Sequence, residues 1–183
     1  MKSALILTYS GIEIDILNPD PDKIIIEDIA HALSMQCRFS GHSRFFYSVA
    51  EHSVECCKLA SDFKLEALMH DAAEAYLHDM VSPLKNNIPE YREYEDKLMR
   101  TIASKFGFMY PLPEETHRID KKMLFKEQCE LMPGFQHYSP GRTIAIPPYL
   151  AEKNFLSCFF KLTANLTPAE SSIQAINTHS PDK

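Results

Sequence analysis

The stretch that decides the fold covers residues 63–79 and reads Phe-Lys-Leu-Glu-Ala-Leu-Met-His-Asp-Ala-Ala-Glu-Ala-Tyr-Leu-His-Asp. Leucine and alanine, which favour helices, dominate it, so the sequence predicts a helix over 63–77. In a regular helix His70 and Glu74 lie on one face, and Asp71 lies about 100° around the axis from His70. Imidazole and carboxylate groups together suit a divalent ion such as zinc, cobalt, manganese or magnesium. The stretch therefore predicts part of a metal site, whose remaining ligands come from elsewhere in the chain.

Two other residues are candidates for those ligands. His52 lies in a helix predicted over 48–60, where Ser48 and Glu51 have the spacing of a capping box. Asp120 lies in a helix predicted over 113–132. Each residue alone is also typical of an ordinary core or surface position, so spacing by itself leaves the metal site open.

The remaining segments complete a helical protein. Residues 4–9 and 12–17 flank Ser10 and Gly11 and predict a small β-hairpin. A polar loop is expected over 38–44, a break at Ser82-Pro83 and a second loop over 133–148. Further helices are predicted over 27–36, 89–106 and 149–162.

Length and composition favour one globular domain. The chain has 183 residues, 45% of them hydrophobic and 24% charged. We expect a single domain over 1–165 and a flexible tail over 166–183. The net charge of −6 argues against a nucleic-acid polymer as partner, and no apolar stretch approaches the ~20 residues of a membrane span.

Five cysteines without a CxxC pair argue against a disulfide framework and against a thiolate zinc site. Reduced thiols fit a cytoplasmic protein. Cys56 and Cys57 form a vicinal pair in an apolar helical stretch, which favours a packing role.

The order of these motifs resembles the HD-domain phosphohydrolase superfamily, whose pattern is H…HD…D. Residues 47–53 (YSVAEHS), 70–74 (HDAAE) and 79–85 (DMVSPLK) look like three segments of one branch. That branch contains bacterial 5′-deoxynucleotidases and short phage dATP triphosphohydrolases. Residues 37–44 (CRFSGHSR) look most like the phage-type members. The resemblance implies an all-α HD-domain bundle around a metal site, which agrees with the helices predicted above.

The resemblance also implies roles for individual residues. The implied metal ligands are His52, His70, Asp71 and Asp120. Glu74 matches the acidic residue beside the attacking water, and Asp79 matches a second acidic residue of the site. The implied substrate contacts are Arg38 and Lys85 at the phosphate, and Phe39 and Pro83 near the base or sugar.

The implied function is metal-dependent cleavage of the 5′-phosphate ester of a deoxynucleotide. The products are a nucleoside with either phosphate or triphosphate, and the sequence leaves that choice open. Alternatives are a hydrolase of an alarmone or cyclic nucleotide, or a metal-binding regulatory module without catalysis. The alarmone enzymes show HDxxED, whereas Ala75 follows Glu74 here, and the Gly-Tyr-Pro signature of the cyclic-dinucleotide group does not occur. Relatives suggest a homo-oligomer, a dimer or larger, in a bacterial cytoplasm or in the host cytoplasm of a phage.

Overall fold

The structure is a computed structural model that describes residues 3–141 and 143–164. The chain is mostly helical, with one small two-stranded sheet near its N-terminus. This confirms the predicted mixture of a helical body and a hairpin. The expected tail over 166–183 lies outside the described residues. Within the described part, no helix combines the length and the apolar character needed to cross a bilayer.

The N-terminal hairpin pairs β1 (Leu5–Leu7) with β2 (Glu13–Asp15) in antiparallel register. Its turn contains Gly11 at a φ of 83°, a backbone conformation that glycine adopts without strain. Ile14 of β2 is completely buried and anchors the hairpin to the helical core. The hairpin is confirmed, although its strands are shorter than predicted.

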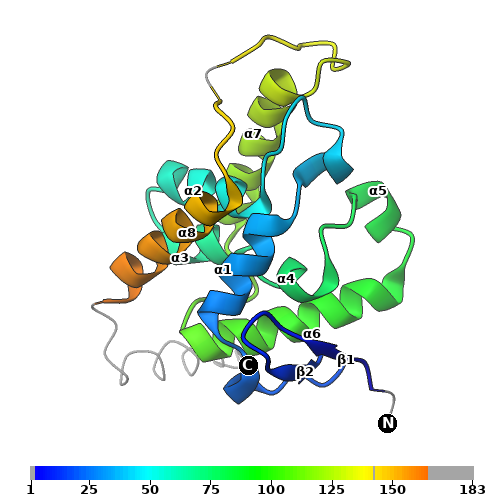
Figure 1. Ribbon diagram of the computed structural model, residues 1–183, viewed down its shortest axis with the longest axis vertical. Helices are drawn as coiled ribbons and strands as arrows, with labels where there is room; N and C mark the ends of the chain where they lie inside the picture. Colours follow the sequence, from blue (N-terminus) through cyan, green and yellow to red (C-terminus); the bar gives the residue numbers. More distant parts are fainter. Residues whose placement is uncertain (1–2, 142, 165–183) are drawn as a thin grey trace, which may run out of the picture.

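The helical body follows in the order α1, α2, α3, α4, α5, α6, α7 and α8, with two short 3₁₀ segments, η1 and η2 (Figure 1). Their bounds are η1 Pro21–Lys23, α1 Ile26–Met35, η2 Arg38–Gly41, α2 Val49–Leu59, α3 Lys64–Met69, α4 Glu74–Leu77, α5 Ser82–Lys85, α6 Pro89–Phe106, α7 Glu114–Leu131 and α8 Pro148–Thr163.

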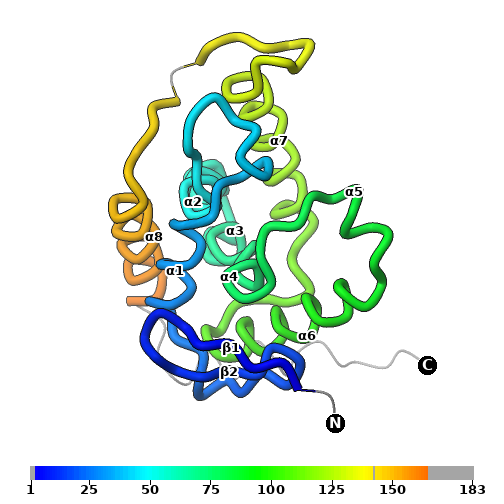
Figure 2. The backbone as a smooth tube through the Cα atoms, turned by 45° about the vertical axis from the view of Figure 1, so that its right-hand side comes forward, coloured from blue at the N-terminus to red at the C-terminus, as the bar shows by residue number. Residues whose placement is uncertain are grey.

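The core lies where α8 packs along α1 and α2, with α3 beside them (Figure 2). Phe155 of α8 is completely buried there, together with Leu33 of α1 and Leu68 of α3. The long helix α6 packs at the edge of this core and contributes Leu98 and Ile102 to it. Helix α7 packs against α2 and α3 on the other side, which leaves one face of α2 between the core and α7.

Local signals account for several helix ends. The Ser48 hydroxyl accepts a hydrogen bond from the Glu51 N–H, and the Glu51 carboxylate accepts one from the Ser48 N–H. This capping box confirms the predicted start of α2, four residues before His52. Gly107, at a φ of 72°, ends α6, in agreement with the helix predicted over 89–106. The helices predicted over 27–36, 113–132 and 149–162 are confirmed to within one or two residues at each end.

The single helix predicted over 63–77 is wrong. The chain instead forms α3, a tight turn over 70–73, and the one-turn helix α4. The carbonyl of Ala67 accepts a hydrogen bond from the His70 ring at 2.9 Å, and the Glu74 N–H bonds the Asp71 carbonyl three residues back. The backbone of His70 stays in the helical region, at φ −60° and ψ −30°, but the hydrogen bonds of this turn tighten to three-residue spacing, which interrupts the regular helix.

Two predicted irregular segments contain short helices. The expected loop over 38–44 holds η2, where Phe39 and Ser40 have φ values of 57° and 51°. The break expected at Ser82-Pro83 is the start of α5, because proline is tolerated in the first turn of a helix.

Candidate metal centre

Four side chains converge between α2, the turn over 70–73 and α7. His52 Nε2 lies 3.2 Å from His70 Nε2 and 3.1 Å from Asp120 Oδ1. Asp71 Oδ2 lies 3.2 Å from His70 Nε2 and 3.8 Å from His52 Nε2. The fold therefore brings together all four residues for which the sequence implies a ligand role.

Three of the four separations fit the coordination sphere of one metal ion. Two donors that each lie about 2.1 Å from an ion are about 3.0–3.4 Å apart at tetrahedral or octahedral angles. The separations of 3.1, 3.2 and 3.2 Å lie in this range, and the 3.8 Å between His52 Nε2 and Asp71 Oδ2 lies above it. Two imidazoles and two carboxylates are donors that zinc, cobalt and manganese accept, and magnesium accepts the carboxylates.

Hydrogen bonds at the far side of each ring select which nitrogen is free. His52 Nδ1 lies 2.7 Å from Glu127 Oε1, and His70 Nδ1 lies 2.9 Å from the Ala67 carbonyl oxygen. Both oxygens are acceptors, so each Nδ1 carries the proton. The Nε2 lone pairs of His52 and His70 then point to the same place, as in histidines that bind metals.

The electrostatics of the centre favour positive charge. Burial lowers the pKa of His70, but the carboxylates of Asp71 and Asp120 outweigh burial and raise the pKa well above its ordinary value. Burial raises the pKa of the Asp71 carboxyl, but His70, His52 and Arg38 lower it well below the usual range. Two ionised carboxylates therefore face two ring nitrogens. The raised pKa means that His70 holds a second proton at neutral pH when no metal is bound, and a metal ion at this centre would take the place of that proton.

Cys56 also lies at this centre, one helical turn after His52. His52, Cys56 and His70 form a group whose donor atoms could hold a metal ion. However, Cys56 Sγ lies 3.5 Å from His52 Nε2 and 4.0 Å from His52 Nδ1, which places the sulfur beside the ring. Burial also raises the pKa of the Cys56 thiol. The expected packing role of Cys56 and Cys57 agrees with their burial. The raised pKa keeps the Cys56 thiol protonated, whereas the lowered pKa values of Asp71 and Asp120 keep both carboxylates ionised and able to bind a cation.

Glu127 is a supporting residue that the sequence did not single out. It lies in α7, only 3% exposed, and accepts bonds from His52 Nδ1 and from Arg38 Nε at 3.1 Å. Burial raises the pKa of Glu127, but His52 and Arg38 outweigh it, and Tyr47 also bonds the carboxylate, so the pKa falls below its ordinary value. One ionised glutamate therefore orients His52, a candidate metal ligand, and Arg38, the arginine that the resemblance implies at the phosphate.

An open cleft of about 390 Å³ begins at this centre. It contains the remaining candidate residues as well as the two aspartates of the centre. Its wall includes Arg38, Phe39, Asp71, Glu74, Asp79, Pro83, Lys85 and Asp120. Neither His52 nor His70 is among the residues that line the cleft.

Glu74 is the most unusual residue in the cleft. It is 5% exposed, and its Oε2 atom has no hydrogen-bond partner in the described part of the chain. Burial raises the pKa of Glu74 well above its ordinary value, as do Asp71 and Asp79. A buried carboxyl oxygen that lines a cleft without a partner is suited to hold a water or a substrate proton.

Two cations face the carboxylates of the cleft. Arg38 Nη1 lies 3.6 Å from Asp71 Oδ2, and Lys85 Nζ lies 3.4 Å from Glu74 Oε1. Lys85 also forms an ion pair with Glu95 of α6 at 2.6 Å. Both side chains are mostly buried and remain charged, so they offer positive charge to an anionic ligand.

Gln36 holds the loop that carries Glu74 and Asp79. Its Nε2 donates to the Glu74 carbonyl at 2.9 Å, and its Oε1 accepts from the Asp79 N–H at 3.0 Å. The intervening His78 adopts a φ of 73°, and its carbonyl accepts a bond from the Tyr91 hydroxyl. No local pattern marks Gln36, because its partners lie about forty residues further along the chain.

Comparison with known proteins gives two close relatives. The chain is 41% identical over 129 residues to the uncharacterized protein YfdR of Escherichia coli, an overlap of 70% of this chain and 72% of YfdR. The chain belongs to the same family as YfdR. An uncharacterized protein of Rhodobacter capsulatus is 34% identical to it over 161 residues, 80% of this chain and 82% of the relative.

The YfdR relatives overlap most of the chain, so the family covers a domain rather than a short motif. A scan against models of protein families gives no match. The names of the relatives state no substrate or reaction. The chemistry of this site must therefore be argued from the geometry of its own residues.

Proposed function

We propose that the protein is a divalent-metal-dependent phosphohydrolase that cleaves the 5′-phosphate ester of a deoxynucleotide. The observation that carries the proposal is the convergence of His52, His70, Asp71 and Asp120 at one end of the cleft. The donor set fits a divalent ion, and both rings are held in the tautomer that leaves Nε2 free. A bound divalent ion supplies positive charge for phosphoryl oxygens and lowers the pKa of water.

Arg38 and Lys85 bind the phosphate in this proposal. The Arg38 guanidinium is fixed by Glu127 at its Nε, which leaves its terminal nitrogens directed toward Asp71 and the cleft. A guanidinium offers two parallel donors to a phosphate, and an ammonium offers a compact charge. Phosphoryl transfer depends mainly on position and charge stabilisation, which these two cations provide.

Glu74 orients the attacking water and accepts its proton. Its unpartnered Oε2 can accept a hydrogen bond from that water, while Oε1 faces Lys85. The pKa of Glu74 is raised by burial, which moves it toward the range where a carboxylate works as a base near neutral pH. Asp79, whose pKa burial also raises, is the second acidic group of the cleft.

The identity of the substrate rests on the resemblance to HD-domain nucleotidases and triphosphohydrolases. The cleft volume falls in the range of about 300–1,000 Å³ of small-molecule sites. Phe39 and Pro83 lie on the cleft wall with Val81 and Leu124, and they offer an apolar surface to a base or sugar. The same resemblance supports a cytoplasmic protein that forms a homo-oligomer. Light scattering of the purified protein tests the oligomeric state.

The experiment is a hydrolysis panel with a matched variant. Protein stripped with chelator receives magnesium, manganese, cobalt or zinc singly and then each deoxynucleoside mono- and triphosphate, with ribonucleotides in parallel. We expect metal-dependent release of nucleoside from a deoxynucleotide, and the co-product distinguishes a nucleotidase from a triphosphohydrolase. Asp71→Ala should be inactive with every metal.

Two results would contradict the proposal. Turnover that persists in the stripped protein would mean that catalysis does not need the ion. Tight metal binding without turnover of any of these nucleotides would favour alarmone or cyclic nucleotides, or a metal-binding module without catalysis.

A further inference from the structure

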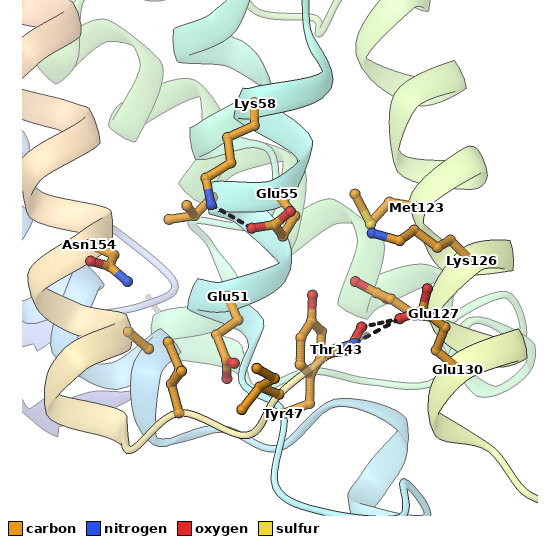
Figure 3. A pocket seen from close by; sticks show the side chains of 14 residues that line it. Tyr47, Glu51, Glu55, Lys58, Met123, Lys126, Glu127, Glu130, Thr143 and Asn154 are labelled. Atoms are coloured by element: carbon orange, nitrogen blue, oxygen red, sulfur yellow. Dashed lines mark hydrogen bonds and ion pairs between the residues drawn. The ribbon is translucent and has the colours of Figure 1, made fainter. Parts of the chain in front are cut away.

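Arg38 and Lys85, the two cations proposed to bind the phosphate, each have a carboxylate partner that does not line the cleft. Glu127 accepts from Arg38 Nε at 3.1 Å, and Glu95 accepts from Lys85 Nζ at 2.6 Å. Neither glutamate belongs to the cleft wall. Glu127 lies instead on the wall of a separate cavity of about 490 Å³ between α2, α7 and α8 (Figure 3). Glu127 also orients His52, whereas the proposed function gives no role to Glu95.

Glu95 and Lys85 form a partly buried ion pair between the long helix α6 and the short helix α5. The Lys85 side chain is 19% exposed, and the Glu95 side chain is 24% exposed. The other three residues of α5 are exposed. Charges that are largely withdrawn from water are screened less than charges on the surface. The attraction of Glu95 therefore helps to decide where the Lys85 ammonium lies.

The ammonium lies between two glutamates and is bonded mainly to Glu95. Lys85 Nζ is 2.6 Å from Glu95 Oε1 and 3.4 Å from Glu74 Oε1. A charge-assisted N–H···O bond is usually about 2.7–2.9 Å long, so the contact with Glu95 is tight and the contact with Glu74 is stretched. Within residues 3–141 and 143–164 no other donor bonds the Glu95 carboxylate, so no other group competes with Lys85 for it.

These contacts leave one donor of the ammonium without a partner. A lysine ammonium has three N–H donors, and two of them are directed to Glu95 and Glu74. The ammonium also lies over the Tyr91 ring, 5.6 Å from its centroid, and the Tyr91 hydroxyl bonds the His78 carbonyl at 2.8 Å. The described part of the chain gives Nζ no third acceptor, and Lys85 lines the cleft. The third N–H is therefore free to bond an oxygen of a bound phosphate.

Without Glu95, the nearest carboxylate for the ammonium would be that of Glu74. The stretched contact would close from 3.4 Å to about 2.8 Å. Glu74 carries the unpartnered Oε2 that is proposed to hold the attacking water. A carboxylate drawn onto Lys85 would leave that position, and a displacement of about 1 Å at a reacting group can cost about 100-fold in rate.

We propose that Glu95 is a positioning residue, which holds the Lys85 ammonium away from Glu74 and leaves one of its N–H groups for the phosphate. Glu95 lies outside the cleft, so it acts through Lys85 rather than on the substrate. Its negative charge lowers the affinity of the cleft for phosphate, while its bond to Lys85 raises the rate. The effect on rate rests on the proposed phosphohydrolase function, whereas the position of the ammonium does not.

The first test is Glu95→Gln, whose amide keeps the size of the side chain and loses its charge. With the nucleotide that the hydrolysis panel identifies as substrate, we expect kcat to fall about 10- to 100-fold and KM not to rise. Binding of inorganic phosphate to the chelator-stripped protein is measured by NMR chemical-shift titration. Its Kd should fall about two- to fivefold, because one negative charge near the cleft is removed. General loosening of α5 would instead raise both KM and Kd.

A double-mutant cycle tests whether Glu95 acts through Lys85. Lys85→Met removes the ammonium and should raise the Kd of phosphate. Adding Glu95→Gln to Lys85→Met should change kcat by less than about twofold, because the group that Glu95 positions is gone. Glu95→Asp keeps the charge on a shorter side chain, and its kcat should lie between those of wild type and Glu95→Gln. The control Glu93→Gln removes an exposed glutamate of the same helix and should change neither kcat nor Kd.

Crystal structures of the wild type and Glu95→Gln give a readout that needs no turnover. The separation between Lys85 Nζ and Glu74 Oε1 should shorten from 3.4 Å to about 2.8 Å in the variant. Thermal melting confirms that each variant is folded.

Several outcomes would overturn the proposal. These are an unchanged kcat in Glu95→Gln, a Kd of phosphate that rises as it does in Lys85→Met, equal losses of kcat from Glu95→Gln with and without Lys85, or an unchanged separation between Lys85 and Glu74. If the wild type turns over no nucleotide, the proposed function fails. The phosphate titrations and the crystal structures then still decide whether Glu95 positions the ammonium.

Discussion

Glu127 and His52 form a 2.7 Å hydrogen bond across the α2–α7 interface, and this bond decides which ring nitrogen faces the metal centre. The two residues are 75 positions apart in the chain, so only helix packing brings them together. Because Glu127 also bonds Arg38, the positions of a candidate metal ligand and of the proposed phosphate-binding cation depend on the same carboxylate. Outer-shell carboxylates of this kind fix ring orientation and make the imidazole a stronger ligand.

We predict that Glu127→Gln lowers affinity for Mn²⁺ by about 10- to 100-fold, the usual effect of removing an outer-shell partner. The amide can still accept a bond from His52, but it carries no charge to balance Arg38 and His52. Calorimetric titration of the chelator-stripped protein measures the change. Glu130→Gln, one turn further along α7, is the matched control, because Glu130 bonds Thr143 rather than the metal centre. Equal Mn²⁺ affinity in wild type and Glu127→Gln would show that Glu127 only packs there.

Asp71 and Glu74 are three residues apart, yet we predict different losses for them. Asp71→Ala removes a ligand and should abolish metal binding and turnover together. Glu74→Ala should keep stoichiometric metal and lose about 10²- to 10⁴-fold in turnover, the range for removing a general base. Metal content by elemental analysis, measured beside initial rates, separates the two effects. Full turnover in Glu74→Ala would remove its assigned role, and stoichiometric metal in Asp71→Ala would place the ion elsewhere.

We predict that Gln36→Leu lowers turnover about 10- to 100-fold and leaves Mn²⁺ affinity unchanged. The change removes both bonds that hold Glu74 and Asp79, and small displacements of catalytic groups cost rates of this order. Gln36→Glu should fall between wild type and Gln36→Leu, because it keeps the acceptor for the Asp79 N–H and loses the donor to the Glu74 carbonyl. A loss of Mn²⁺ affinity equal to the loss of turnover would instead indicate general loosening of the site.

The sequence predicted the fold where local chemistry decides it. Ser48 and Glu51 carry the information for the start of α2, and Gly107 carries that for the end of α6. The break between α3 and α4 could not be predicted, because every residue over 63–77 is compatible with a helix. At the break the backbone hydrogen bonds tighten to three-residue spacing, and the His70 ring bonds the Ala67 carbonyl in a site completed by distant residues.

The sequence named most of the residues that the structure brings together at the candidate site. Spacing indicated His70, Asp71 and Glu74 as a group, His52 and Asp120 were candidates from elsewhere in the chain, and the resemblance implied their ligand roles. Glu127 and Gln36 carry no such signal, because a glutamate in a charged helix and a glutamine at a helix end are usually solvated. Their partners are set by tertiary packing, so only the structure identifies them.

Asp96 gives a prediction for stability in acid. Its carboxylate accepts two bonds from Arg100, at 2.8 and 3.2 Å, and one from the Tyr110 hydroxyl at 2.9 Å. These bonds hold the pKa of Asp96 below its ordinary value. A carboxyl with a lowered pKa in the folded state stabilises the fold above the pKa of the unfolded chain, about 3.9, and this stabilisation is lost as the pH falls through the folded-state pKa.

We therefore predict that Asp96→Asn lowers the free energy of unfolding by about 0.5 kcal/mol at neutral pH, the size measured for exposed ion pairs. The side chain is 47% exposed, so solvent screening keeps the effect small and about 1 M salt should reduce it further. Urea unfolding between about pH 7 and pH 3 measures the difference from wild type, which should shrink as the pH falls. Glu93→Gln, exposed on the same helix, is the control and should show no such pH dependence. A difference that stays constant over this pH range would mean that Asp96 acts through packing or helix propensity rather than through its charge.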